Sequence, residues 1–168
     1  MTKYYIDSSG KYLGGFDGAP PPAGAVEVPT APSDASHKWT NGAWVPSVSS
    51  LKARVSAKRY AVEIAGINFT YRTVPTPVST SRETRASMIG VYTKANEGRW
   101  VEAPATENPF KFGDDKFRPA TTQEVLDIYR AVETHVDVCY AIEAKKLAEI
   151  DATGTTNIDT GWPATANG

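Results

Sequence analysis

The chain has 168 residues, a formal net charge of −1 at pH 7, and a hydrophobic fraction of 40%. This near-neutral charge gives no general attraction to nucleic acid or anionic membranes, so neither is expected as a partner. The single cysteine excludes an internal disulfide. The first ten residues lack the basic and apolar regions of a signal peptide, and no apolar run approaches the roughly 18 residues that span a bilayer. We therefore expect a soluble protein made in the cytoplasm.

Residues 1–47 are predicted to form a small β-rich module. "KYYID" and "KYLGGFDG" are typical of two short strands around the turn at residues 8–10. In the stretch 19–36 five prolines forbid a helix, and only "AVEVP" is suited to pairing as a further strand. This module has few aliphatic side chains and can bury little apolar surface. We therefore expect it to be stable only when it packs against a partner or against the rest of the chain.

The segment "HKWTNGAWVP" closes this module and predicts a tight hairpin. Asn41 and Gly42 form the preferred two-residue type I′ turn, in which both residues need positive φ. Trp39 and Trp44 then face each other as a pair without mutual backbone hydrogen bonds, where side chains lie closest. Such an aromatic pair adds about 0.5–1.5 kcal/mol beyond the burial of area. Two exposed tryptophans also suggest a sugar-binding platform, but a self-bracing hairpin explains them better.

A mainly helical region follows. A helix is predicted over 51–65, capped by Ser49 and Ser50 and stopped by Gly66. Residues 67–74 then alternate between apolar and polar, which predicts a half-exposed strand ended by the prolines that follow.

A second helix is predicted to begin at a capping box formed by Thr80 and Glu83, and to end at Gly98. Between this helix and the next, residues 99–120 predict short strands and turns. The apolar residues of the second helix are expected to form its buried stripe: Met88, Ile89, Val91 and Tyr92.

The strongest local prediction is a third helix, from a capping box at Thr121 and Glu124 to about Ala152, with no glycine or proline before Gly154. At 1.5 Å per residue it would be about 45 Å long. Its broad apolar face contains Val125, Ile128, Val132, Val136, Cys139, Ile142 and Leu147.

Part of this face has the spacings of three and four that are typical of a coiled-coil seam. The seam comprises Val125, Ile128, Val132, His135, Cys139 and Ile142. A helix this long in a small domain predicts packing against other copies, so we expect a homo-oligomer, with a trimer favoured. At the C-terminus, Trp162 and Pro163 are expected to tuck back before a loose tail at 165–168.

Few residues suggest chemistry. The chain's two histidines are far apart in sequence, and His135 with Cys139 on one helix face is better explained by packing than by metal binding. In a trimer, three copies of His135 could meet at an axial ion, which is the weaker alternative. Asp114 and Asp115 lack the spaced oxygens of a calcium loop. We predict no catalytic, cofactor-binding or metal-binding residue, and no enzymatic activity.

Several segments, taken in order, resemble a domain of unknown function that recurs in tail-fibre and tail-associated proteins of tailed bacteriophages. They are "RYAVEIAGI", "STSRETRASMIGVY", "NPFKFGDDKF", the long helix with His135 and Cys139, and "IDTGWP". The resemblance covers roughly residues 50–164. The N-terminal part is similar to the short first module of phage tail-fibre assembly proteins, which often ends in a Lys-Trp…Gly…Trp-Val hairpin followed by a helix.

The resemblance implies a non-enzymatic tail protein that binds the receptor-binding fibre or the baseplate, as a virion component or as an assembly chaperone. It would act in the host cytoplasm during assembly and then reside in the virion tail. Trp39, Trp44 and the seam residues are the expected partner-binding positions. The alternatives are a carbohydrate-binding module for the host surface and, with least support, an enzyme acting on surface polymer. The expected fold is α+β, with a β-rich module at 1–47, a domain at 48–164 and a tail at 165–168.

Overall fold

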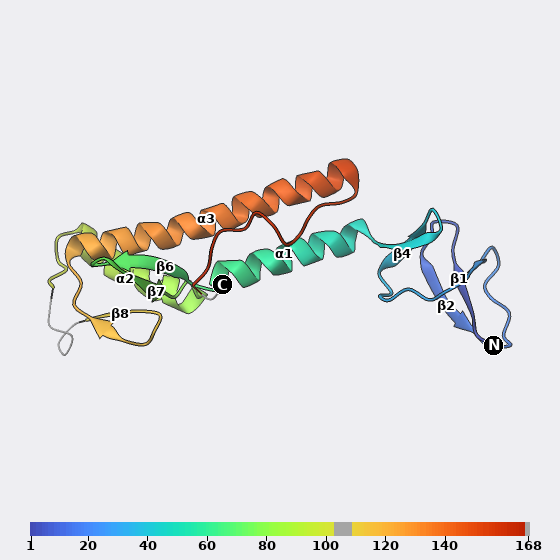
Figure 1. Ribbon diagram of the computed structural model, residues 1–168, viewed down its shortest axis with the longest axis horizontal. Coiled ribbons are helices and arrows are strands. Elements are labelled where there is room, and N and C mark those ends of the chain that lie inside the picture. The colour runs from blue at the N-terminus through green and yellow to red at the C-terminus, as the bar shows by residue number, and fades with distance from the viewer. Residues whose placement is uncertain (103–108, 167–168) are drawn as a thin grey trace. The chain divides into compact units, whose positions relative to one another are not determined.

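The computed structural model describes residues 1–102 and 109–166 and shows an α+β chain (Figure 1). The chain divides into two compact units. The N-terminal unit comprises Met1–Arg54 and Ala148–Thr156, and the helical unit comprises Val55–Leu147 and Asn157–Gly168. Helices α1 (Val48–Ile64) and α3 (Thr122–Thr153) contribute residues to both units. The predicted boundary after residue 47 therefore differs from this division.

The N-terminal unit is built on antiparallel strands, as the sequence predicted. Its three-stranded sheet has the order β2-β1-β3, and a separate hairpin joins β4 to β5. The strands are β1 (Lys3–Ile6), β2 (Tyr12–Phe16), β3 (Val26–Val28), β4 (His37–Thr40) and β5 (Ala43–Pro46). The segment "AVEVP" supplies β3, so this part of the Pro-rich stretch does pair.

The β4–β5 hairpin has the predicted register and turn. Trp39 lies opposite Trp44, and the turn residues Asn41 and Gly42 have φ values of 52° and 82°. The two indole rings meet edge to face, with centroids 5.2 Å apart and an interplanar angle of 68°. The hairpin is therefore braced by its own aromatic pair.

Helix α1 begins three residues earlier than predicted. The hydroxyl of Ser47 accepts the backbone N–H of Ser50 at 3.2 Å, so Ser47 caps the helix, and Ser49 and Ser50 lie inside its first turn. The C-terminal stop is as predicted, because Gly66 follows the helix with a φ of 82°.

The helical unit contains two hairpins and a short helix besides its parts of α1 and α3. They are β6 (Ile67–Tyr71), β7 (Val74–Val78), α2 (Arg82–Asn96), β8 (Phe110–Lys111) and β9 (Phe117–Arg118). The strand order is β6-β7 in one sheet and β8-β9 in the other, and both pairs are antiparallel.

The expectation that prolines end the strand after residue 74 is wrong, because Pro75 and Pro77 lie within β7. The two-residue turn at Arg72 and Thr73 has φ values of 45° and 76°, and Tyr71 closes it opposite Val74. Bonded and non-bonded pairs alternate from that closing pair, so both prolines fall at non-bonded positions. Their missing N–H groups therefore remove no bond from the ladder.

Helix α2 is capped by Ser81 and not by the predicted Thr80. The hydroxyl of Ser81 accepts the N–H of Thr84 at 3.1 Å. Thr80 is fully buried, and its hydroxyl accepts the N–H of Gly66 at 2.9 Å. Thr80 therefore fixes the end of α1 to the start of α2.

The predicted buried stripe of α2 is also narrower than expected. Met88 is buried, Val91 and Tyr92 are half-buried, and Ile89 is 57% exposed. Only one edge of this helix faces the core, so apolar spacing overstated its burial.

The capping box of α3 is confirmed in both directions. The N–H of Glu124 donates to the Thr121 hydroxyl at 3.1 Å, and the N–H of Thr121 donates to the Glu124 carboxylate at 2.8 Å. Thr121→Ala should lower the free energy of unfolding by about 1 kcal/mol, because it leaves a helix N–H without its acceptor. Urea unfolding measures this, with Thr121→Ser as the control that keeps the hydroxyl. A loss of the same size in both variants would contradict the capping role.

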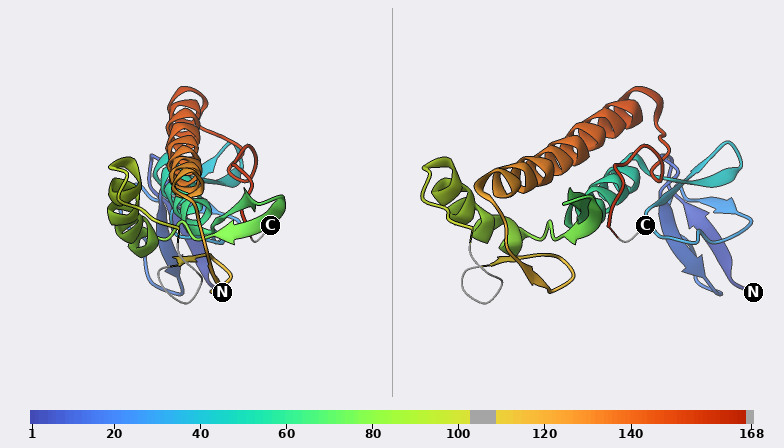
Figure 2. Two further views of the ribbon diagram at one scale, coloured as in Figure 1. Left: turned by 90° about the vertical axis from the view of Figure 1, so that its left-hand side faces the viewer. Right: turned by 60° about the vertical axis from the view of Figure 1, so that its left-hand side comes forward.

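The core of the helical unit lies between the β6–β7 hairpin, α2, the β8–β9 hairpin and the first half of α3 (Figure 2). It contains Ile67, Tyr71, Val78, Met88, Ala95, Trp100, Phe110, Phe112, Ala120, Val125, Ile128 and Val132. Two buried polar groups are satisfied inside it: the indole N–H of Trp100 donates to the carbonyl of Ala120 at 2.8 Å, and the Tyr71 hydroxyl donates to the carbonyl of Pro119 at 2.5 Å.

The C-terminal segment returns to this unit, as predicted for Trp162, whose ring centroid lies 5.7 Å from the Lys146 ammonium nitrogen of α3. The tail is ordered further than expected, because the N–H of Ala166 donates to the carbonyl of Gly66 at 3.0 Å. Residues 167–168 of the predicted loose tail, and 103–108 of the predicted irregular segment, lie outside the described residues. In the described part of the chain, no helix is both long and apolar enough to cross a membrane.

Candidate functional site

The predicted partner-binding seam lies mostly inside the chain's own fold. Val125, Ile128, Val132 and Cys139 are at most 1% exposed and His135 is 6% exposed. Ile142 alone is half-buried. The spacing of three and four was correctly assigned to one helix face, but that face packs on its own domain. The proposed trimer seam is therefore corrected: these side chains are not offered to a second copy in this fold.

His135 and Cys139 are packing residues of this face. The His135 Nε2 atom lies 3.0 Å from the carbonyl oxygen of Val62, and the Cys139 Sγ atom lies 3.8 Å from that same nitrogen. The His135–Val62 contact joins α3 to α1. Among the described residues, no group of three His, Cys, Asp or Glu side chains is placed to hold a metal ion.

Burial raises the pKa of the Cys139 thiol to about 11, and the nearby Glu63 carboxylate adds to the rise. At pH 8, about one thiol in a thousand would then be ionised in the folded chain, against about a quarter in an unfolded one. We expect labelling by a thiol reagent such as dithionitrobenzoate to be at least two orders of magnitude slower in buffer than in denaturant. Stoichiometric labelling of the native chain within seconds would contradict the burial of this thiol.

The hairpin tryptophans make contacts within the N-terminal unit. The indole N–H of Trp44 donates to the carbonyl of Thr30 at 2.9 Å, and Tyr12 packs edge-on against the Trp44 ring with centroids 5.7 Å apart. Trp39 and Trp44 are both half-buried. Rings that pack edge to face do not form the flat, coplanar surface on which a sugar stacks, so this geometry favours bracing over sugar binding.

The acidic pair is held by basic side chains, as a polar turn would be. Both Arg118 amino groups donate to the Asp114 carboxylate, at 2.6 and 2.8 Å, and hold the pKa of Asp114 well below its usual range. Lys111 pairs with Asp115 at 2.7 Å. Asp115 takes a left-handed conformation, with a φ of 60°, at the tip of the β8–β9 hairpin.

A buried charge network joins the three helices. The fully buried carboxylate of Glu63 accepts from Arg59 on its own helix and from Arg85 on α2. Arg59 also pairs with Glu143 on α3 at 3.1 Å, and its guanidinium lies 4.6 Å from the centroid of the Tyr140 ring. Two cations and two anions balance here, which is the condition under which buried charges are tolerated.

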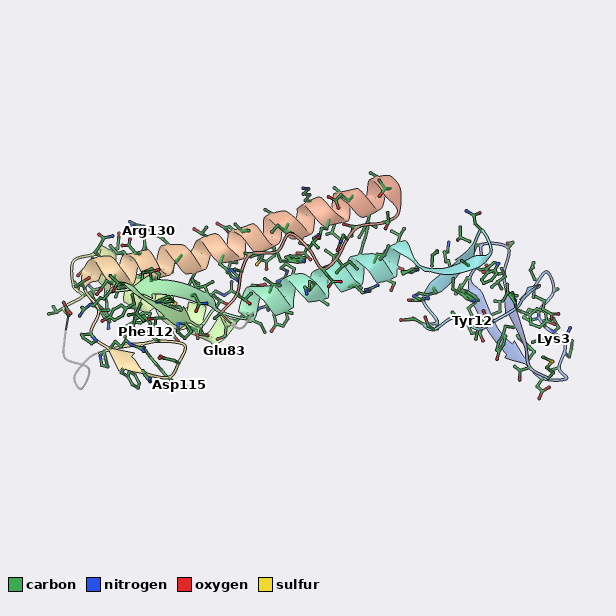
Figure 3. The ribbon with its side chains drawn as sticks, viewed as in Figure 1. Lys3, Tyr12, Glu83, Phe112, Asp115 and Arg130 are labelled. Atoms are coloured by element: carbon green, nitrogen blue, oxygen red, sulfur yellow. The ribbon has the colours of Figure 1, made fainter. Side chains whose placement is uncertain are left out.

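A groove of about 580 Å³ lies between α2 and the strand β8. We call it the α2–β8 groove. Its α2 side consists of Glu83, Thr84, Ser87, Met88, Val91 and Lys94, and its strand side is the continuous run 109–113. Ser79, Trp100 and Asp115 complete the lining. Glu83, Phe112 and Asp115 lie near one another around the β8–β9 hairpin (Figure 3).

The groove has an apolar floor and charged ends. Met88, Trp100, Phe110 and Phe112 are buried, so their few accessible atoms form the floor. The volume lies within the range of known binding sites, roughly 300–1,000 Å³.

A family model described as "Domain of unknown function (DUF4376)" matches residues 48–161, which is more than half of the chain. The chain belongs to the DUF4376 family. Searches of curated proteins and of solved structures found no match. All residues that line the α2–β8 groove, and the whole Glu63 network, fall within the matched DUF4376 domain.

The DUF4376 domain therefore carries its main candidate site where sequence reasoning placed none. The groove joins Ser79 and α2 to Trp100, residues 109–113 and Asp115, and no motif at these positions signals binding. The sequence offered only an indirect indication of the groove. The segment "NPFKF" places Phe110 and Phe112 on the same side of a short strand, and the helix that precedes it has a weak apolar stripe.

Proposed function

We propose that this DUF4376 protein is a non-enzymatic component of a bacteriophage tail that binds the receptor-binding fibre or the baseplate. It acts either as a permanent virion component or as a chaperone during fibre assembly. The identity of the partner rests on the resemblance of residues 50–164 and of the N-terminal module to phage tail proteins. The mode of action rests on the geometry of the DUF4376 domain.

The observation that supports binding most directly is the α2–β8 groove. It is open to solvent, and its apolar floor is formed by the few accessible atoms of the core residues Trp100, Phe110 and Phe112. Among the described residues that line it, the titratable groups are the carboxylates of Glu83 and Asp115 and the ammonium groups of Lys94 and Lys111. A protein that works by holding a partner needs such a surface and needs no reacting pair.

The N-terminal unit adds a second exposed surface. Val26 is 53% exposed on the edge strand β3, and Leu13 is 37% exposed on the edge strand β2. Exposed apolar residues on edge strands are suited to contact with another protein. On this proposal the chain is made in the host cytoplasm and meets the fibre or baseplate there.

Quantitative mass spectrometry of purified phage particles tests this proposal. A fixed copy number per particle supports the virion component. Absence from particles, combined with misfolded or missing fibres when the gene is deleted, supports the chaperone. Absence from particles with normal fibres in the deletion strain contradicts both forms.

A further inference from the structure

The outer side of β6 is a free edge of the β6–β7 hairpin. Bonded and non-bonded pairs alternate from the closing pair of Tyr71 and Val74, so Asn68 and Thr70 both belong to non-bonded pairs. The N–H and C=O groups of these two residues therefore point away from β7. Among the described residues, no group bonds to them. Both residues are exposed, so the edge that they form lies at the surface.

Two hydrogen bonds at neighbouring positions confirm this direction. Pro77 lies opposite Asn68, and its carbonyl points away from β6 and accepts the N–H of Gly113 at 2.7 Å. Gly66 precedes β6 in the same alternation, and its carbonyl accepts the N–H of Ala166 at 3.0 Å. The chain's own C-terminal segment therefore already bonds to the start of this edge, and the edge continues beyond that bond along β6.

The two edges of the hairpin differ in their protection against further pairing. Pro75 and Pro77 occupy the non-bonded positions of β7, so its outer edge has no N–H at either position. Natural edge strands are commonly blocked by prolines, lysines, bulges or short length. The five residues of β6, Ile-Asn-Phe-Thr-Tyr, include no proline and no charge, and they pair with β7 in continuous register. The hairpin thus discourages strand addition at β7 and permits it at β6.

The two faces of β6 determine which side chains a matching strand would carry. Ile67, Phe69 and Tyr71 pack on the core of the helical unit, and Phe69 is only half-buried, so its ring can be covered further. Asn68 and Thr70 are exposed on the other face and are uncharged. Side chains alternate between the two faces of a sheet. A matching strand therefore carries apolar residues opposite the first set and uncharged polar residues opposite the second.

We propose that the outer edge of β6 binds an extended segment of the partner protein, which adds to the β6–β7 sheet as a third, antiparallel strand. The segment matches the five residues of β6, with its central apolar residue opposite Phe69. Free backbone groups at every second residue fit an extended chain, whereas a helix has its own backbone groups bonded internally. Strand addition is a recurring way to hold a peptide, because backbone bonds give affinity and alternate side chains give specificity. This inference rests on the proposed function as a binding protein.

Amide NMR spectra of the full chain, titrated with two acetylated and amidated peptides, test the inference. Both peptides have the sequence Val-Thr-Val-Thr-Val and carry two N-methyl groups, so their composition is the same. In the first probe the third and fifth residues are methylated, which keeps the N–H groups of both threonines. In the second probe the threonines are methylated, which removes the N–H groups that an antiparallel strand presents to β6.

The first probe should shift the amide signals of Asn68 and Thr70 and slow their exchange with solvent at least about tenfold at saturation, because these groups become hydrogen-bonded. The second probe should bind at least about tenfold more weakly. No binding of the first probe, equal binding of the two, tighter binding of the second, or shifts confined to other residues would overturn the proposal.

A proline at the edge tests the same contact from the protein's side. Thr70→Pro removes one free N–H at a non-bonded position, where the opposite strand already carries Pro75. It should weaken the first probe at least about tenfold, whereas Thr70→Ala, which keeps the N–H, should leave the Kd within about threefold. Circular dichroism melts verify that both variants fold, and the paired peptides test the wild-type chain without any substitution. Equal effects of the two variants would contradict binding through the backbone.

Light scattering of the full chain at the concentration of the titration distinguishes a foreign strand from a second copy. We expect a monomer. A dimer that Thr70→Pro dissociates would show that β6 pairs with another β6, which would overturn the proposal. If the first probe fails to bind while the chain is found in particles, the edge inference fails and the proposed function stands. If the probes behave as expected while the chain is absent from particles and deletion leaves the fibres normal, the proposed function fails alone.

Discussion

Replacement of Glu63 by glutamine should lower the free energy of unfolding by about 3–5 kcal/mol. Glu63 is fully buried and accepts from both Arg59 and Arg85, whose side chains are 13% and 21% exposed. Glutamine has the same shape but no charge. The variant therefore keeps the packing and leaves two largely buried cations with a single remaining anion, Glu143.

Chemical denaturation followed by circular dichroism measures this loss. Glu97→Gln is the matched control, because Glu97 also pairs with an arginine, Arg99, but both side chains are about half exposed. An exposed pair of this kind contributes less than about 1 kcal/mol. If Glu63→Gln costs no more than Glu97→Gln, the network is not a determinant of the fold.

Ile128→Ala should destabilise the chain by about 2–5 kcal/mol, because it deletes three buried carbon atoms from a side chain with no exposed surface. The loss should be the same over about a hundredfold range of protein concentration, because Ile128 packs within its own chain. Had α3 presented this face to other copies, stability would rise with concentration.

Val138→Ala on the same helix is the control. Val138 is 38% exposed, so its truncation creates no cavity, and alanine is the better helix former. We expect a change within about 0.5 kcal/mol, measured in the same denaturation series. A concentration-dependent midpoint for the wild-type chain would restore the seam interpretation.

Local signals predicted much of this fold. The Asn41-Gly42 turn, the Thr121–Glu124 capping box and the stop at Gly66 each depend on residues close in sequence, and all three are present. The turn at Arg72 and Thr73 escaped prediction, since neither residue is typical of positive φ. At this turn, the pairing of Tyr71 with Val74 and the packing of the hairpin on the core outweigh the backbone preferences of Arg72 and Thr73.

The candidate site escaped prediction for a different reason. The α2–β8 groove brings α2 together with residues 109–113, and the Glu63 network brings α1 together with Arg85 on α2 and Glu143 on α3, so both depend on contacts between segments distant in sequence. The apolar spacing of α3 showed which residues share a face but not what covers that face. An intrachain core and an oligomer seam have the same pattern, so only the fold distinguishes them.

The number of fibres on particles assembled without this chain tests its proposed role in the tail. Fibre subunits are counted by quantitative mass spectrometry in particles from the wild-type phage, from a strain that lacks the gene, and from the deletion strain supplied with the gene in trans. We predict that deletion strips fibres from the particles and that complementation restores them. A full set of fibres and undiminished infectivity in the deletion strain would contradict the proposal that this DUF4376 protein binds and secures a tail component.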